Sequence, residues 1–506
     1  MSQPSFIELI AHNAMQYADR PAFSTGDSTY SYRQFFAIAR GIHDEIVRMG
    51  YGNARRIGIV AGDSVHTSAS ILTIWSVGAA FVSLNVHYPA ERNARIIEEA
   101  GLDLILTSRA GQEWPRYLPK ADGTFRLLHT GEIEPASAPL TFPAARPSNL
   151  AYLFFTSGST GIPKGVPISH ANLSAFMNTF LSGMGYDFTP EDRFLQMFAL
   201  TFDLSVVSTV APLSVGGCCC TIPQTGIAYM NIANVLASQN VTVALMVPSV
   251  LPYLRRFFNE LNFPSLRLNQ FCGEALMQDI VSEWSHCVPN ARIENVYGPT
   301  EATIFCTRYV WTRDRGAAES VNGIVPIGKA MPGTSTYVVN DAGEQCKDGE
   351  RGELCLAGDQ VMTGYWNDRE KTGQSFVGLS SEGMAVSAYR TGDIVYVNEN
   401  SNLVYCGRKD SQVKIDGHRV ELGEIEHFAR SYTGHPTAAA VMVKDAAGFD
   451  RLRLFVGARD IDSAALESYL KSRLPDYMWP ASITVLAELP LNLNGKIDRP
   501  ALAKMP

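Results

Sequence analysis

The segment Ala151-Tyr-Leu-Phe-Phe-Thr-Ser-Gly-Ser-Thr-Gly-Ile-Pro-Lys-Gly165 joins an apolar run to a loop of small hydroxyl residues and glycines. The apolar run is typical of a parallel-sheet strand, because strands covered on both faces are continuously apolar. The loop exposes backbone N–H groups that can surround phosphate oxygens, and Lys164 adds a charge. It is not a Walker A loop, since Pro163-Lys164-Gly165 replaces Gly-Lys-Ser/Thr. The segment predicts an α/β fold with a phosphate site; a plain surface loop is the alternative.

The chain on both sides of this segment alternates apolar runs with helical patterns. The runs 56–62, 79–85 and 102–108 are apolar, and 93–101 has helical spacing between the last two. Such alternation indicates parallel sheets covered by helices. The stretches Ser64–Ala90 and Leu204–Leu254 lack charged residues but are interrupted by Gly, Pro and polar residues. We therefore interpret them as buried core and not as membrane spans.

The pattern of the sequence changes after about Glu350, where short strand-like runs are separated by polar turns. The segment 421–432 has Leu422, Ile425 and Phe428 on one helical face. Segments 437–445 and 451–460 predict a strand pair, and a helix follows with Ser463 as its N-cap. We expect a large N-terminal domain of parallel and mixed sheets, 1–408, and a small mobile α+β domain, 409–506.

The composition excludes several classes of protein. The chain has 506 residues, 46% hydrophobic and 18% charged, with a net charge of −8. Disorder is excluded, and a general nucleic-acid binder would be basic. Nine cysteines occur without a C-x-x-C pair, which argues against a zinc ribbon. Free thiols and an N-terminus unlike a signal peptide favour the cytoplasm, and we expect neither nucleic acid nor a membrane as partner.

Further motifs carry groups suited to a nucleotide. In 295–302, Asn-Val-Tyr-Gly-Pro-Thr-Glu-Ala, Tyr297 offers a flat face to a base, and Glu301 offers oxygens to a phosphate-bound Mg²⁺. In 389–393, Tyr-Arg-Thr-Gly-Asp, Asp393 can accept both hydroxyls of a ribose. Arg408 can meet phosphate, and Lys496 lies in an Asn-Gly-Lys turn. Each motif by itself is also compatible with an ordinary polar turn.

Taken in order, the pieces TSGSTGIPKG, YGPTEAT, YRTGD, GRKDSQVKIDGHRVELGEIE and NGKIDR resemble the adenylate-forming superfamily. The resemblance is closest to the amino-acid adenylation enzymes of peptide synthetases and to D-alanine–carrier protein ligases. It extends from Tyr30 to Lys496. Such enzymes join a carboxylic acid to ATP, release pyrophosphate, and pass the acyl group to a phosphopantetheine thiol.

The resemblance implies roles for individual residues. Tyr297 would stack on adenine, Glu301 would hold Mg²⁺, and Asp393 would bind the ribose. The implied ATP-binding residues are Thr156, Ser157, Gly158, Ser159, Thr160, Lys164, Gly273, Glu274, Ala275, Asn295, Tyr297, Gly298, Thr300, Asp393, Arg408 and Lys496.

Lys496 is the expected catalytic residue. Attack of a carboxylate on the α-phosphorus builds negative charge, which a bridging lysine stabilises without a covalent step. By resemblance, Asp410 marks the hinge of the small domain, and Gly417 lies in the loop that faces the pantetheine arm.

Asp203 is expected to define the class of acid. It matches the family position that pairs with an α-amino group, and a buried carboxylate needs a cationic partner; a helix-capping Asp is the alternative. The pocket otherwise lacks charge, which favours a small neutral amino acid. The substrate-binding residues implied by the resemblance are Asp203, Leu204, Val207, Met246, Gln270, Cys272, Val296, Ile304 and Phe305.

The FDLSV and FCGE segments resemble those of the D-alanine ligases, and this resemblance favours D-alanine as the substrate; L-alanine, proline or a short branched amino acid stays open. The chain ends ten residues after Lys496, so we expect a separate phosphopantetheinylated carrier protein as acceptor. Two other classes compete: an acyl- or aryl-CoA ligase, which would leave Asp203 unpaired, and a non-catalytic protein on the same fold.

Overall fold

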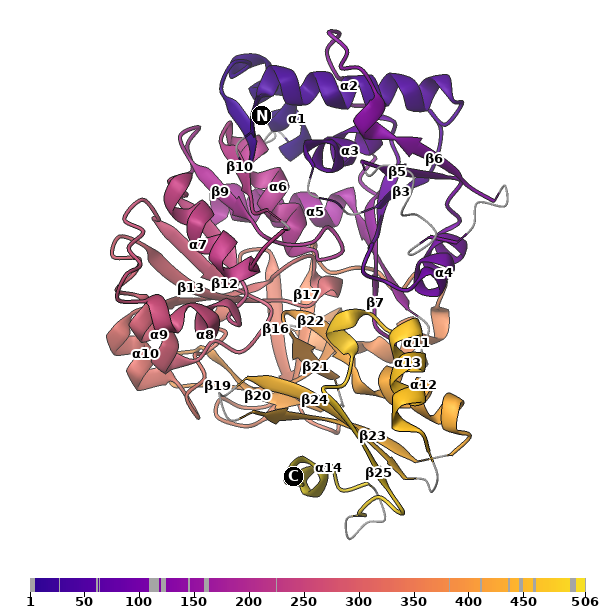
Figure 1. Cartoon of the computed structure of the whole chain (residues 1–506). Helices are drawn as coiled ribbons and strands as arrows, with labels where there is room; N and C mark the ends of the chain where they lie inside the picture. The colour runs from indigo at the N-terminus through magenta and orange to yellow at the C-terminus, as the bar shows by residue number, and fades with distance from the viewer. Residues whose placement is uncertain are drawn as a thin grey trace.

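The structure is a computed structural model, coloured along the chain in Figure 1. It describes residues 5–26, 28–60, 62, 64–108, 118–119, 124–143, 146–158, 163–223, 225–381, 383–409, 412–435, 437–445, 449–457, 461–491 and 497–505.

One large sheet has a parallel centre and antiparallel edges, in the order β15-β14-β13-β12-β11-β9-β10-β1-β2. Its inner strands β11 and β12 are buried along their whole length. The sequence of β11 is continuously apolar, as expected for a strand covered on both faces, whereas β12 also buries Asn269 and Gln270. The strands are β1 (Pro21–Thr25), β2 (Ser28–Ser31), β9 (Arg193–Gln196), β10 (Cys218–Thr221), β11 (Val243–Met246), β12 (Leu268–Phe271), β13 (Arg292–Tyr297), β14 (Thr307–Trp311) and β15 (Lys329–Ala330).

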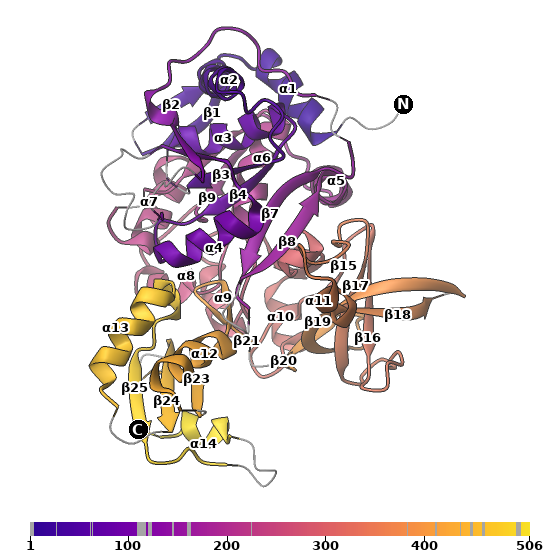
Figure 2. The ribbon, with the colours of Figure 1, turned by 90° about the vertical axis from the view of Figure 1, so that its right-hand side faces the viewer.

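A second sheet has the order β6-β5-β3-β4-β7-β8, with only β8 antiparallel to its neighbour. Helices cover both sheets in Figures 1 and 2. Several of them begin at a capping residue; for example, Ser31 and Gln34 form a capping box at α2. The strands are β3 (Arg56–Val60), β4 (Ala80–Leu84), β5 (Leu104–Thr107), β6 (Arg126–His129), β7 (Leu150–Thr156) and β8 (Lys164–Ser169). The helices around the two sheets are α1 (Phe6–Gln16), α2 (Tyr32–Arg48), α3 (Val65–Ser76), α4 (Ala90–Ala100), α5 (His170–Asn178), α6 (Leu204–Val215), α7 (Ala228–Ser238), α8 (Val250–Leu254), α9 (Gln278–Trp284) and α10 (Arg313–Glu319).

A third sheet and the C-terminal part follow. The C-terminal part has its own apolar core, which includes Ile425, Leu454 and Leu466. It lies at the lower end of the molecule in Figure 2. The third sheet contains β16 (Thr334–Val339), β17 (Gly352–Gly358), β18 (Phe376–Ser381), β19 (Met384–Val397) and β20 (Leu403–Arg408), with α11 (Arg369–Ser375) beside it. The C-terminal part contains the β21–β22 hairpin (Gln412–Ile415 and His418–Glu421), β23 (Ala438–Lys444), β24 (Asp450–Gly457), β25 (Ser482–Leu486), α12 (Leu422–Thr433), α13 (Ser463–Arg473) and α14 (Arg499–Ala503).

Buried polar contacts hold the C-terminal part against α4. Arg92 and Glu424 form an ion pair of 2.5 Å, and both side chains are buried. The ring of His418 in the β21–β22 hairpin stacks on that of Tyr477 with centroids 3.9 Å apart, and the Tyr477 ring also contacts Tyr88 of the large domain, with centroids 6.4 Å apart. The ion pair therefore joins α12 to α4, and Tyr477 links the hairpin to the large domain.

The structure confirms the predicted mixed α/β fold with a small C-terminal domain. The strand pair is β23 and β24, and Leu422, Ile425 and Phe428 are buried on α12. One expectation was wrong: Asp462, and not Ser463, caps α13, because its carboxylate accepts the N–H groups of residues 464 and 465. In the described part of the chain, no helix is both long and apolar enough to cross a bilayer.

Candidate functional site

Thirteen of the residues predicted for the site line a single cavity. It lies where β7, β12 and β13 end, and the β21–β22 hairpin closes it. Carboxyl ends of parallel strands are the usual ligand site of α/β sheets. The predicted residues in its lining are Thr156, Ser157, Asp203, Leu204, Cys272, Gly273, Tyr297, Gly298, Thr300, Ile304, Asp393, Arg408 and Gly417.

Asp393, the predicted ribose ligand, projects from β19 into the cavity. Its carboxylate pairs with Arg408 at 2.7 Å, since the two residues face each other across β19 and β20. The Tyr297 hydroxyl donates to the other carboxylate oxygen. Burial, together with Asp393, raises the pKa of Tyr297 well above its usual value. Arg408 therefore contacts Asp393 instead of being free for phosphate.

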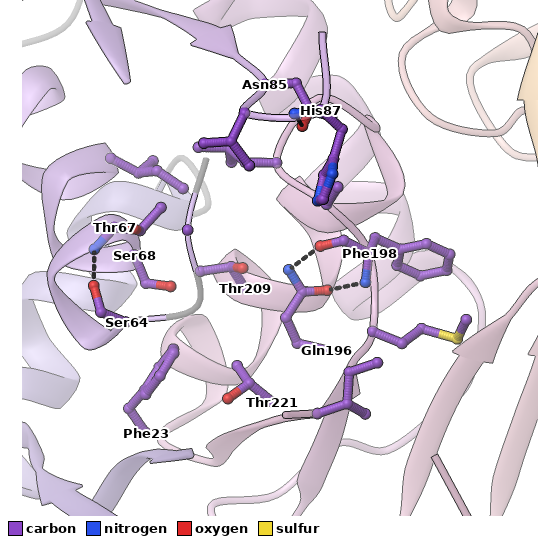
Figure 3. A pocket seen from close by; sticks show the side chains of 17 residues that line it. Phe23, Ser64, Thr67, Ser68, Asn85, His87, Gln196, Phe198, Thr209 and Thr221 are labelled. Atoms are coloured by element: carbon purple, nitrogen blue, oxygen red, sulfur yellow. Dashed lines mark hydrogen bonds between the residues drawn. The ribbon is translucent and has the colours of Figure 1, made fainter. Parts of the chain in front are cut away.

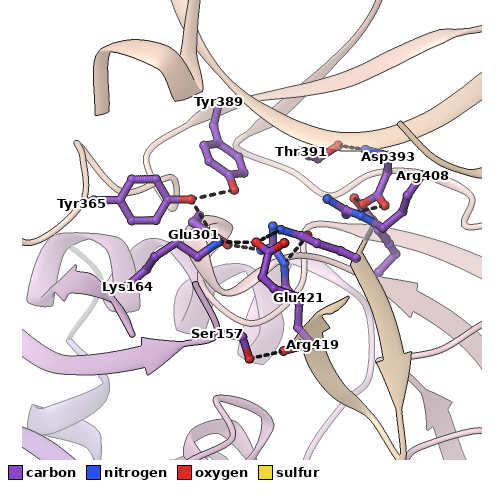
Figure 4. A network of polar contacts seen from close by, with 12 residues as sticks. Ser157, Lys164, Glu301, Tyr365, Tyr389, Thr391, Asp393, Arg408, Arg419 and Glu421 are labelled. Atoms are coloured by element: carbon purple, nitrogen blue, oxygen red, sulfur yellow. Dashed lines mark hydrogen bonds and ion pairs between the residues drawn. The ribbon is translucent and has the colours of Figure 1, made fainter. Parts of the chain in front are cut away.

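We call Lys164, Glu301, Arg419 and Glu421 the Lys164 side of the site (Figure 4). The Lys164 ammonium lies 2.7 Å from Glu421, and the Arg419 guanidinium lies 2.8 Å from Glu301. The Tyr365 hydroxyl donates to Glu301 at 2.6 Å. The two residues predicted to bind phosphate and Mg²⁺ are thus both paired with side chains of the β21–β22 hairpin.

The pairing controls the ionisation of this side. Burial alone would raise the pKa of Glu301, but Arg419, Tyr365 and Lys164 lower it to about 2. Burial and the neighbouring Arg419 charge lower the pKa of Lys164, and Glu421 offsets part of this effect. The Glu301 carboxylate therefore stays ionised at neutral pH.

We call Asp203, Leu204, Cys272 and Ile304 the Asp203 side. Asp203 occupies the N-cap position of α6 but makes no side-chain cap hydrogen bond, so the capping interpretation fails. The residue is 7% exposed, and its Oδ2 atom has no hydrogen-bond partner among the described residues. Burial, reinforced by the charge of Glu301, raises its pKa to about 7, although Thr300 and Lys414 partly oppose this shift. An unpaired buried carboxylate favours a cationic ligand.

The inner end of the Asp203 side is closed by packed side chains. The Gln270 amide donates to the Tyr186 hydroxyl at 2.9 Å and to Glu294 at 3.0 Å. Phe305 packs against Phe176 with ring centroids 4.9 Å apart. Five predicted pocket residues are buried here and do not line the cavity: Val207, Met246, Gln270, Val296 and Phe305.

Ile304 reaches the cavity from a strained loop. Thr303 and Ile304 have φ angles of 54° and 76°, which β-branched residues rarely adopt. The Gln360 amide donates to the carbonyls on both sides, Ala302 at 2.7 Å and Phe305 at 2.8 Å. These two bonds hold the loop in its strained conformation.

Several predicted residues have other contacts. Glu274 accepts the N–H groups of Ser249 and Gly417. Asn295 donates to two backbone carbonyls and is structural. Of the described ATP-site candidates, Gly158, Lys164, Glu274, Ala275, Asn295 and Glu301 do not line the cavity, whereas Ser159, Thr160, Asp410 and Lys496 lie outside the described residues.

Five residues in or next to the site were not predicted from the sequence: Lys414, Glu421, Tyr365, Gln360 and Tyr477. Lys414 and Glu421 lie in the quoted hairpin motif, where charged residues recur. Tyr365, Gln360 and Tyr477 carry no such signal, because their proximity to the site depends on long-range packing.

A second cavity is also polar but differs from the first in the hydrogen bonding of its buried side chains. It lies between the two large sheets, with a volume of about 60 Å³, room for a few waters (Figure 3). The Gln196 amide and the Phe198 backbone bond each other twice at 3.1 Å, and Asn85 accepts the His87 N–H at 2.9 Å. Among the described lining residues, no buried side-chain polar atom lacks a partner.

Metal binding at Glu301 depends on which further ligands a metal ion finds beside this carboxylate. No group of three or more His, Cys, Asp or Glu side chains in the described part of the chain could hold a metal ion. Mg²⁺ is commonly bound by one carboxylate together with substrate phosphates and waters. Glu301 fits that arrangement once Arg419 has moved away.

Comparisons with known proteins connect this geometry to a family. The family model described as AMP-binding enzyme matches residues 10–366. Tyrocidine synthase 3 of Brevibacillus parabrevis is 35% identical over 501 residues, which is 98% of this chain. The match spans only 8% of the length of that synthase.

Solved structures match along the whole chain. The Vibrio cholerae adenylation domain AlmE, in complex with glycyl-adenosine-5'-phosphate, superposes with a TM-score of 0.86 at 26% identity, covering 100% of this chain and 98% of AlmE. PA1221, described as containing adenylation and PCP domains, has a TM-score of 0.86 at 26% identity, covering 99% of this chain and 84% of the matched one.

Proposed function

The chain belongs to the AMP-binding enzyme family, and on this premise we propose that it activates a small amino acid as an aminoacyl adenylate. ATP is the co-substrate, and pyrophosphate is the first product. The aminoacyl group then passes to the phosphopantetheine thiol of a carrier protein. PA1221, which has adenylation and PCP domains, supports this kind of acceptor, and we propose that the carrier is a separate chain.

The unpaired carboxylate of Asp203 carries the proposal. A fatty or aryl acid would leave this buried charge without a partner, whereas an α-ammonium group supplies one. The solved complex of AlmE with a glycyl adenylate supports an amino acid in the same kind of site.

The packed inner wall supports a short side chain. Because Gln270 is held by Tyr186 and Glu294, and Phe305 by Phe176, little room is left behind Cys272. We propose glycine or alanine, with D-alanine favoured by the resemblance of the FDLSV and FCGE segments.

The nucleotide needs a different orientation of the C-terminal part. Glu421 pairs with Lys164, and Arg419 pairs with Glu301. The triphosphate would need Lys164, and Mg²⁺ would need Glu301, so both ion pairs must break before the nucleotide binds. We propose that residues 409–506 rotate about Asp410, so that the hairpin leaves the site and Lys496 enters it for adenylation. Tyr297 and Asp393 then bind the adenosine, and Glu301 and the phosphates hold Mg²⁺.

Free thiols support a reducing compartment for this enzyme. All nine cysteines lie in described parts of the chain, and none forms a disulfide. We propose the cytoplasm as its location.

Amino-acid-dependent exchange of labelled pyrophosphate into ATP tests the function. The panel contains glycine, both alanine enantiomers, L-proline, L-valine, acetate, benzoate and a fatty acid. We expect glycine or an alanine enantiomer to give the fastest exchange. Faster exchange with acetate, benzoate or the fatty acid would overturn the amino-acid class, and no exchange with any acid would favour a non-catalytic protein. Fastest exchange with proline or valine would overturn only the proposal that the substrate is glycine or alanine.

A further inference from the structure

Three consecutive cysteines, Cys218, Cys219 and Cys220, begin strand β10 and have no part in the proposed function. Successive side chains of a strand point to opposite faces, so the outer two cysteines share one face and Cys219 lies on the other. The Cys219 thiol donates to the Ser208 carbonyl of α6 at 3.6 Å. The Sγ atoms of Cys218 and Cys220 lie 4.0 Å apart. One face of β10 therefore carries two adjacent thiols, which we call the Cys218–Cys220 pair.

Long polar side chains cross the face of β10 that carries this pair. Arg193 of β9 lies directly beside Cys218, and Ser24 of β1 lies directly beside Cys220 on the opposite side of the strand. Arg193 donates to the side-chain oxygen of Gln239 at 2.6 Å, and Ser24 donates to the same oxygen at 3.0 Å. Since its two partners stand on either side of β10, the Gln239 side chain lies across the pair. Arg193 and Gln239 are half-buried and flexible, so they can move aside to admit a small ion.

The surroundings favour a single negative charge on the pair. The Cys220 thiol lowers the pKa of Cys218; burial opposes this shift, and the Arg193 charge supports it. The pKa of Cys220 is raised by the Cys218 sulfur and by burial, with Arg193 opposing. The protein can therefore stabilise one thiolate here, whereas two thiolates side by side need a cation between them.

We propose that the Cys218–Cys220 pair is a metal site that binds Cu(I) between its two thiolates. Metal–sulfur bonds of about 2.3 Å, the length of a zinc–thiolate bond, span the 4.0 Å between the sulfurs at an S–metal–S angle of about 120°. The two sulfurs can thus hold the ion from their present positions. Thiolates are soft ligands and select soft ions such as Cu(I).

Other common metal ions fit the pair less well. Zn²⁺ takes four protein ligands at structural sites, and no group of three or more His, Cys, Asp or Glu side chains suited to a metal ion is present among the described residues. Mg²⁺ and Ca²⁺ prefer oxygen. Cu(I) is stable with two thiolates, and the complex carries one negative charge. The Arg193 guanidinium beside Cys218 compensates that charge.

Binding exchanges two protons for one metal ion. Each thiol releases its proton to solvent, two Cu–S bonds form, and copper stays Cu(I), so the step needs neither an oxidant nor a reductant. Arg193 stays protonated. Neither ATP nor an amino acid takes part, so this inference does not depend on the proposed function.

An anaerobic titration of the full chain against bicinchoninate, which forms a coloured complex with Cu(I), tests the site. The wild-type protein should remove one more equivalent of Cu(I) from that complex than Cys218→Ser or Cys220→Ser removes. The ultraviolet absorption of Cu(I)–thiolate should decrease in parallel. The other cysteines contribute equally to all of these proteins.

Cys219→Ser is the matched control, because its thiol lies on the other face of the same strand. It should bind as much Cu(I) as the wild-type protein. Equal loss in Cys219→Ser and Cys218→Ser, or no difference between Cys218→Ser and the wild-type protein, would overturn the site.

Arg193→Met keeps both thiols and supplies a second test if a serine variant does not fold. The affinity for Cu(I) should fall about tenfold, because the bound complex loses its compensating charge. Arg193→Lys should restore most of the affinity, and circular dichroism verifies that both variants are folded. An unchanged affinity in Arg193→Met would contradict a charged complex beside this residue and would overturn the proposal.

Discussion

The Lys164 side and the Asp203 side are built around the same strand ends, yet they treat buried charge differently. On the Lys164 side, Lys164 and Glu301 are neutralised by residues of the β21–β22 hairpin. On the Asp203 side, a carboxylate that is equally buried has an oxygen with no partner among the described residues. The first set of charges is satisfied by the protein itself, and the second is not.

The difference indicates which occupant each side exchanges. On the proposed function, the paired charges lie where the hairpin and a ligand alternate, since Glu421 and Arg419 carry charges of the same sign as phosphate and a metal ion. The unpaired charge lies where only a ligand can complete the site. In the second cavity, every fully buried polar side-chain atom of the described lining residues has a partner, so it offers no unpaired charge of this kind.

The largest expected effect comes from Asp203→Ala, which removes the unpaired charge. We expect kcat/KM for the amino acid to fall on the order of 10²–10³-fold, because a desolvated ammonium loses a partner worth about 3–5 kcal/mol. Pyrophosphate exchange measures it. The KM for ATP should change less than threefold, and a loss shared equally by ATP and amino acid would contradict the comparison.

Opposite effects on stability should follow from two matched Asp→Asn substitutions. The raised pKa of Asp203, about 7 against 3.8, means that protonation stabilises the folded protein, and this stabilisation is lost as pH rises from about 4 to 7. At pH 8, Asp203→Asn should therefore raise the free energy of unfolding by about 1–3 kcal/mol.

Asp393→Asn should lower the same free energy by about 3 kcal/mol, because Arg408 loses its buried partner. Thermal denaturation without ligands measures both variants. Changes of the same sign would show that the two carboxylates are not in contrasting environments.

Gln360→Leu tests the strained loop that carries Ile304. Two buried carbonyls lose their donor, so we expect unfolding to become easier by about 2 kcal/mol. The amino-acid KM should rise as Ile304 shifts. Thr334→Val removes only the 3.1 Å bond to the other end of the Gln360 amide and should have less effect on both. Equal effects of the two variants would rule out a clamp.

The smallest expected effect is a pH dependence confined to the Asp203 side. Since the ammonium needs an ionised Asp203, kcat/KM for the amino acid should fall about tenfold between pH 8 and pH 6, following the pKa of about 7. The KM for ATP should stay nearly constant over this range, because the Tyr365 hydroxyl and the Lys164 charge still lower the pKa of Glu301 after Arg419 has moved away, so its carboxylate remains ionised. A parallel fall for both substrates would refute the assignment to Asp203.

Much of the architecture could be predicted from the sequence. Continuous apolar runs such as 102–108 form strands that are buried on both faces, because apolar side chains on both faces of a strand are removed from water only inside a core. Helical spacing predicted that Leu422, Ile425 and Phe428 lie on the buried face of α12. The N-cap of α13 could not be predicted in this way, because Asp462 and Ser463 are both good capping residues and the local backbone geometry decides which of them caps the helix.

The chemical character of the site was also determined by the sequence. The family resemblance carried by the motifs assigns Asp203, Tyr297 and Asp393 to one site, and the three residues line one cavity. Residue type alone says which groups carry charge, what they can donate or accept, and which backbone turns favour them.

The tertiary structure alone decided which charges are satisfied. Lys164 meets Glu421 across 257 positions of sequence, and Glu301 meets Arg419 across 118. Asp203, buried to a similar degree, has an unpartnered oxygen. No local pattern encodes these outcomes, because ion pairing and desolvation depend on which distant segments pack together, and burial converts that packing into pKa, stability and ligand preference.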